Sequence, residues 1–163
     1  MKNLTVTICL TLVVLLGSVG TSWGADYDKG LAAAQSGDFA TALREWTPLA
    51  EQGDVVAQFN LGFMYDEGKG VLQDYKTAVK WYTLAAEQGD AYAQYNLGQM
   101  YRKGEGVPQD YVYAHMWGNI AASNGYEDGG KLRDLFAEEM TATQIEKAQE
   151  LARECVRKEY KGC

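Results

Sequence analysis

Acidic side chains are numerous in this 163-residue chain, 22 in all, but we expect most of them at helix caps or on solvent-exposed faces. His115 is the only histidine, and no paired cysteine or carboxylate motif accompanies it in a pattern typical of a metal site. No nucleophile stands at a recognisable spacing from it. The sequence therefore predicts no catalytic residue, no metal site and no cofactor. We expect a protein that is not an enzyme, in which His115 occupies a half-buried position on a helix.

The two cysteines near the C-terminus are candidates for a disulfide bond. Eight residues of unbroken helix would separate Cys155 from Cys163 by about 12 Å, which exceeds the roughly 7 Å limit between bridged Cα atoms. A bond therefore requires the helix to end near Lys158, which Gly162 permits. The alternative is that Cys155 remains a buried free thiol on the apolar side of the last helix. An oxidising compartment favours the disulfide, as a terminal clip without a redox role.

The N-terminal residues predict that the chain is exported. Lys2 precedes an apolar stretch over residues 4–17, which is shorter than the roughly 20 residues of a membrane span but suits a secretory signal. Ser22 and Gly24 fit the small residues that precede a cleavage site. We expect residues 1–24 to be removed, which leaves a periplasmic or secreted protein without stable membrane insertion. A retained anchor is disfavoured because no basic cluster follows the segment.

The charge of the chain restricts its partners. The formal net charge is −7, and it becomes −8 without residues 1–24, which contain Lys2 and no acidic residue. Nucleic-acid phosphates require a basic face, and anionic membrane surfaces attract basic segments as well. The acidic charge therefore argues against both nucleic acid and membrane surfaces as partners.

An internal repeat organises most of the chain. The pentapeptide at residues 50–54 recurs at residues 86–90, a shift of 36 residues (86 − 50 = 36). Many residues between positions 57 and 85 are identical to the residue 36 positions later, and this alignment of the two copies needs no gap. Each copy predicts two helices, because its apolar residues recur at helical spacing. The residues expected to cap these helices are aspartates, at positions Asp54, Asp74, Asp90 and Asp110.

The pattern from Ala57 to Gly89, A-x3-L-G-x2-Y-x2-G-x-G-V-x2-D-Y-x2-A-x2-W-x3-A-A-x2-G, resembles the Sel-one-like repeat family. This family is related to the tetratricopeptide repeats and has a longer, glycine-bearing loop between its helices. The resemblance implies an all-α fold, a right-handed α-solenoid of antiparallel helix pairs. We divide the chain into a signal peptide (1–24), a tetratricopeptide-like first unit (25–53), two Sel-one-like repeats (54–89 and 90–125) and a C-terminal capping helix pair (126–163). Atypical terminal units of this kind cover the apolar end of a solenoid.

The resemblance also implies a function, because solenoids of this family resemble adaptor and scaffold proteins. We therefore expect a non-catalytic scaffold or adaptor of the bacterial envelope that binds a protein or peptide on the concave surface formed by its first helices. The groove positions carried over from the family are Val56, Phe59, Asn60 and Phe63 in one repeat and Tyr92, Tyr95, Asn96 and Gln99 in the next. A charged residue follows one turn later in each repeat, Asp66 in the first and Arg102 in the second.

The residues themselves support this face. Val56, Phe59 and Phe63 form a second apolar stripe beside the core stripe, and a helix apolar on two faces must be buried twice or bind something. Part of the stripe must pack against the neighbouring repeat, and we expect Val56 and Tyr92 to serve that purpose. The amides of Asn60 and Asn96 carry both donors and acceptors. We hypothesise that they bind the backbone of an extended ligand.

Two other classes of function stay open. A cell-wall-related enzyme or small-ligand binder would need a cluster of polar residues around a pocket, which the sequence does not reveal. A secreted effector or inhibitor would differ from an envelope scaffold in the location of the mature protein.

Overall fold

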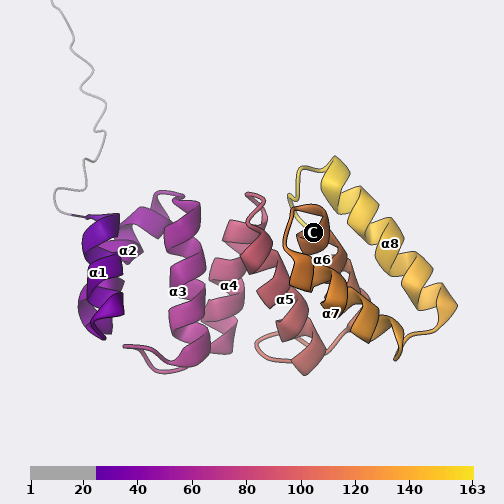
Figure 1. Ribbon diagram of the computed structural model, residues 1–163, viewed down its shortest axis with the longest axis horizontal. Helices are drawn as coiled ribbons and strands as arrows, with labels where there is room; N and C mark the ends of the chain where they lie inside the picture. Colours follow the sequence, from indigo (N-terminus) through magenta and orange to yellow (C-terminus); the bar gives the residue numbers. More distant parts are fainter. Residues whose placement is uncertain (1–24) are drawn as a thin grey trace, which may run out of the picture.

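The computed structural model describes residues 25–163, which form α-helices and no strand (Figure 1). The helices follow one another in a row from α1 to α8, which agrees with the predicted all-α solenoid. In chain order they are α1 (Tyr27–Gln35), α2 (Phe39–Glu51), α3 (Val55–Glu67), α4 (Tyr75–Ala86), α5 (Ala91–Lys103), α6 (Tyr111–Ser123), α7 (Glu127–Ala137) and α8 (Ala142–Arg157).

From α1 to α7, each helix packs against the next one along the row. α3 packs on α4 and α5 on α6, each within one repeat, while α2 with α3 and α4 with α5 join neighbouring units. Each unit therefore has contacts mainly with the units before and after it, as in other solenoids. The predicted signal segment, residues 1–24, lies outside the described residues.

The local signals in the sequence place the helix ends. The side chains of Asp54 and Asp90 accept hydrogen bonds from the backbone N–H groups of Ala57 and Ala93, so the predicted N-caps are confirmed. Asp74 and Asp110 cap α4 and α6 in the same way. These bonds satisfy N–H groups that otherwise have no partner in the first turn.

Each repeat keeps a glycine in its first helix because the partner helix comes very close. A Cβ atom on Gly62 would lie 2.5 Å from the ring of Tyr82, which is fully buried. The partner helix therefore meets Gly62 with a large side chain, Tyr82. At Gly98 the backbone itself comes close, because a Cβ atom would lie 3.2 Å from the carbonyl oxygen of Ala114.

In each repeat, one buried glutamine of the first helix is hydrogen-bonded to the end of the preceding helix. The side chain of Gln58 donates to the carbonyl oxygen of Ala50 (3.0 Å) and accepts from Gln88 (2.8 Å). Gln94, which is 0% exposed, donates to Ala86 (3.1 Å) and accepts from Asn124 (2.9 Å). Buried amides of this kind are stable only when both ends are hydrogen-bonded.

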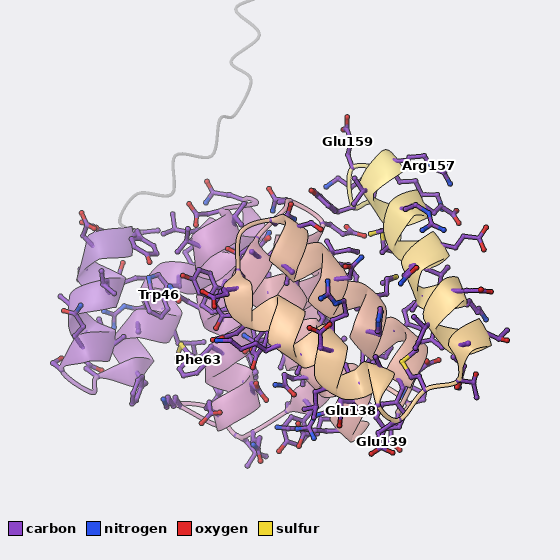
Figure 2. All side chains as sticks on the ribbon, turned by 45° about the vertical axis from the view of Figure 1, so that its right-hand side comes forward. Trp46, Phe63, Glu138, Glu139, Arg157 and Glu159 are labelled. Carbon is purple, nitrogen blue, oxygen red and sulfur yellow. A yellow bond between two sulfur atoms is a disulfide. The ribbon has the colours of Figure 1, made fainter. Side chains whose placement is uncertain are left out.

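The last two helices differ in packing from the helix pairs of the central repeats. α7 lies against α6 at a very close crossing, where a Cβ atom on Gly129 would lie 2.7 Å from the carbonyl oxygen of Gly118. α8 also packs along α6, whereas α7 and α8 share almost no contact. Figure 2 shows Glu138 and Glu139 at the end where α7 joins α8, and Arg157 at the opposite end of α8.

The C-terminal tail folds back onto the second repeat. α8 ends at Arg157, the chain reverses, and Cys163 forms a disulfide with Cys155 across a Cα–Cα distance of 5.4 Å. The hydroxyl of Tyr160 donates to Asn124 (2.9 Å), and the amine of Lys161 donates to the carbonyl oxygen of Glu87 (2.8 Å). The tail therefore fastens the end of α8 to the junctions that follow α4 and α6.

Candidate partner-binding face

The first helices of the two repeats and the start of α7 bring a row of aromatic side chains together. The ring centroids of Phe59 and Tyr92 are 6.0 Å apart, those of Tyr92 and Tyr126 are 4.7 Å apart, and those of Tyr95 and Tyr126 are 5.0 Å apart. Pairs at these distances stabilise one another beyond their buried area. We call the surface formed by Phe59, Phe63, Tyr92, Tyr95 and Tyr126 the first-helix face.

Exposure on this face differs from the expectation for two residues. Tyr92 packs against the neighbouring units through Phe59 and Tyr126, as expected, but its side chain is still 56% exposed, and Val56 is 47% exposed. Phe63 is 38% exposed, and the amine of Lys69 lies 4.3 Å from its ring centroid. Phe59 is half-buried and also contacts the ring of Tyr82. The exposed aromatic surface is therefore centred on Tyr92 and Phe63.

The two asparagines, which the hypothesis treats as equivalent, have different surroundings. The amide nitrogen of Asn60 donates to the hydroxyl of Tyr27 in the first unit, at 3.2 Å. Asn96 is half-buried, and within residues 25–163 its amide forms no such bond. Asn96 is therefore the better placed of the two to bind the backbone of a ligand.

A hydrogen-bonded chain of side chains runs along α5. The amide nitrogen of Gln99 donates to the hydroxyl of Tyr95 (2.9 Å), and the Nε–H of Arg102 donates to the amide oxygen of Gln99 (3.0 Å). These bonds hold three of the predicted site residues in one line. The terminal nitrogens of the Arg102 guanidinium group are not needed for this chain, so they can contact an acceptor on a partner.

Asp66, the counterpart of Arg102 in the first repeat, faces a buried tyrosine. Its carboxylate accepts a hydrogen bond from Tyr82 at 3.3 Å. Burial raises the pKa of Asp66 above its ordinary value. This residue therefore supports the packing of α3 against α4.

Tyr126 belongs to the first-helix face, although it is not among the site residues predicted from the sequence. Residues Asp54, Asp90 and Tyr126 are each 36 residues apart, and the first two are helix N-caps. Tyr126 is the N-cap residue of α7 and makes no capping hydrogen bond with its side chain. The sequence signal for the role of Tyr126 is that a tyrosine replaces the capping aspartate found at this position in both preceding repeats.

Within residues 25–163, no three or more histidine, cysteine, aspartate or glutamate side chains are arranged to hold a metal ion. His115 is 2% exposed, so it is buried rather than half-buried as expected. The additional burial comes from α7 and α8, which both pack on α6.

Among the helices of residues 25–163, none has the length and apolar character that a membrane span requires.

Comparison with known proteins identifies the repeats. Residues 55–90 and 91–126 each match the family model of the Sel1 repeat, which confirms the resemblance, with each match starting one residue after the predicted repeat. A search of curated proteins found no match.

Two solved structures share the fold. A protective antigen of uropathogenic Escherichia coli strains, described as displaying an SLR fold, has a TM-score of 0.77 and 31% identity over 82% of this chain and 30% of its own. A Sel1 repeat protein from Oxalobacter formigenes has a TM-score of 0.66 and 31% identity over 70% of this chain and 47% of its own. This chain therefore spans less than half the length of either protein.

Proposed function

We propose that this chain, which carries two Sel1 repeats in an α-solenoid with the SLR fold, is a non-catalytic scaffold of the bacterial envelope that binds a protein or peptide through its first-helix face. Sel1 repeats generally mediate protein interactions. Solenoids build extended binding surfaces from equivalent positions of successive repeats.

The observation that carries the proposal is the exposed aromatic row. Tyr92 is 56% exposed, yet it lies between Phe59 and Tyr126 and is packed against both. A side chain held in this way loses little conformational freedom when a partner covers it. Tyrosine is one of the residues that most often dominate binding energy at interfaces, because its ring buries a large area and its hydroxyl makes a hydrogen bond.

Polar groups beside the row supply specificity. Arg102 is oriented through Gln99, and Lys69 lies over the ring of Phe63. Both are cations on a chain with a net charge of −7. The first-helix face therefore suits a partner segment that combines apolar side chains with acidic ones.

Two features support a location in the envelope. Residues 1–24 have the pattern of a secretory signal. The disulfide between Cys155 and Cys163 is of the kind that persists in oxidising compartments such as the periplasm.

Site-specific photo-crosslinking tests the proposal. A photoreactive phenylalanine analogue replaces Tyr92 in one protein and Leu72, which is 91% exposed on the loop between α3 and α4, in a control. Both proteins are produced with residues 1–24 in a bacterial host and irradiated in intact cells. We expect a discrete adduct with an envelope protein from position 92 and none from position 72. The same adduct from both positions, or an adduct from position 72 alone, would contradict the proposed face.

A further inference from the structure

A polar cavity lies at the C-terminal end of the molecule, away from the first-helix face. α6 packs against both α7 and α8, and these two helices diverge from the turn that joins them (Figure 1). The space between them has a volume of about 440 Å³. Its polar lining consists of His115 and Asn119 from α6, Arg133 and Asp134 from α7, and Gln149 and Arg153 from α8.

His115 is an unsatisfied polar group in the wall of this cavity. The residue is 2% exposed, and its Nδ1 atom is buried without a hydrogen-bond partner. A buried nitrogen without a partner is unfavourable, and such atoms are normally satisfied by protein, water or a ligand. The corresponding position in the first repeat is Val79, so the histidine is not required by the repeat itself.

One cation that lines the cavity, Arg153, is exposed and also lines a second hollow beside Glu146 and Glu150. The Nε and Nη2 atoms of Arg133 each lie 2.7 Å from one carboxylate oxygen of Asp134. The Nη1 atom of Arg133 donates to the amide oxygen of Asn119 at 3.4 Å, which leaves the amide nitrogen of Asn119 as a donor. Arg153 lines the cavity and forms no ion pair within residues 25–163.

We propose that the cavity between α6, α7 and α8 binds a carboxylate, with the guanidinium group of Arg153 as its main partner. The planar guanidinium group offers two parallel N–H donors that match the two oxygens of a carboxylate. The amides of Asn119 and Gln149 supply further polar contacts around it, and the buried imidazole of His115 lies in the cavity wall.

The charge of the site selects among anions. Arg133 is already paired with Asp134, so Arg153 balances a single negative charge. A second charge on the ligand would be repelled by the carboxylate of Asp134 in the same cavity. The site therefore favours a monoanionic carboxylate over the doubly charged form of phosphate.

The proposal can be tested by NMR because the chain has a single histidine. The imidazole signals of His115 therefore report on this cavity without overlap from another histidine. The protein is titrated at constant pH with acetate, with N-acetylalanine, with its neutral analogue N-acetylalaninamide and with inorganic phosphate. We expect saturable shifts with a carboxylate and none with the amide.

Two variants define the contact. R153Q removes the cation from the cavity, and we expect it to weaken binding by about tenfold or more, because charge-assisted bonds are the strong ones. R157Q removes an equally charged side chain one turn later on α8, outside the cavity, and should bind as the unmodified protein does. Thermal unfolding of both variants checks that α8 remains packed.

The outcomes divide clearly. Saturation by acetate and N-acetylalanine alike supports a site for small carboxylates, and saturation by N-acetylalanine alone supports a site for a peptide C-terminus. Equal shifts with the neutral amide, no saturable shift with either carboxylate, a stronger response to phosphate, or unchanged binding by a folded R153Q protein would each overturn the proposal.

Discussion

The rings of Tyr92 and Tyr126 lie 4.7 Å apart between their centroids and join α5 to the start of α7 across the first-helix face. Tyr126 stands 36 residues after Asp90, at a position where both preceding repeats have a capping aspartate. α7 consequently begins without a side-chain cap. At this position the last unit has an aromatic side chain on the first-helix face in place of a helix cap.

Two substitutions at Tyr126 should separate its roles in stability and binding. Tyr126→Ala removes the contacts with Tyr92 and Tyr95, and we expect it to lower the free energy of unfolding by about 1–2 kcal/mol. Tyr126→Asp removes the same contacts but restores a cap, so it should be about 1 kcal/mol more stable than the alanine variant. Urea unfolding measures this difference. Partner binding should weaken equally in both, whereas recovery of binding in the aspartate variant would contradict a role for the ring.

The buried glutamine of the second repeat should be important for stability. Gln94→Ala leaves the carbonyl oxygen of Ala86 and one amide hydrogen of Asn124 without their partners, which should cost about 2–4 kcal/mol. Gln52→Ala is the matched control, because the amide of Gln52 bonds the carbonyl oxygen of Pro48 on the exposed surface. We expect the control to change the free energy of unfolding by less than about 0.5 kcal/mol. Equal effects of the two substitutions would show that burial of Gln94 does not matter.

Much of this architecture was predictable because it repeats. The period of 36 residues places equivalent residues in equivalent surroundings, so the caps at Asp54 and Asp90 could be identified from spacing alone. The period does not say which residue of the partner helix makes the closest contact with Gly62, which in the structure is Tyr82. The exposure of Tyr92 was also missed, because it depends on how far the neighbouring unit extends over α5.

The C-terminal unit was harder to predict because it departs from the repeat. The sequence indicated two capping helices, and both are present. It did not indicate that α8 would pack on α6 and diverge from α7. The polar cavity depends on that divergence. Its residues come from three helices and share no spacing, so no pattern in the sequence brings His115 and Arg153 together.

His115 should make the stability of the protein depend on pH. Burial, together with the positive charge of Arg133, lowers the pKa of His115 below its ordinary value of 6.5, against the opposing effect of Asp134. Arg153 from α8 also lines the cavity. Between the ordinary pKa and the lowered one, the unfolded chain binds a proton that the folded chain does not. Stability must therefore fall as the pH drops through this interval.

The comparison with His115→Asn isolates this effect. Urea unfolding is measured from pH 7.5 to pH 5 in buffers without carboxylates. Carboxyl groups such as Asp66, whose pKa burial raises, titrate in both proteins and therefore cancel in the difference. We expect the stability advantage of the unmodified protein to shrink towards low pH. A difference that stays constant, or that grows towards low pH, would contradict a buried neutral histidine.

The disulfide should hold the tail without organising the repeats. Cys163→Ala breaks the bond to Cys155 but leaves the buried side chain of Cys155 in place. We expect a loss of about 2 kcal/mol, as for a bridge that closes a short loop. Hydrogen exchange should become faster at Gly162, whose N–H donates to Glu87, and remain unchanged within α3 and α5. Faster exchange throughout the repeats would instead assign the disulfide a role in the whole fold.

The most direct test of the first-helix face is the affinity of the crosslinked partner for three forms of the protein. Dissociation constants are measured for the unmodified chain, for Tyr92→Ala and for Leu72→Ala. Tyr92 is exposed on the first-helix face, and Leu72 is exposed on a loop. We predict that Tyr92→Ala weakens binding by about tenfold or more, whereas Leu72→Ala changes it by less than about twofold. Unchanged affinity for a folded Tyr92→Ala protein would contradict the assignment of this face as the binding surface.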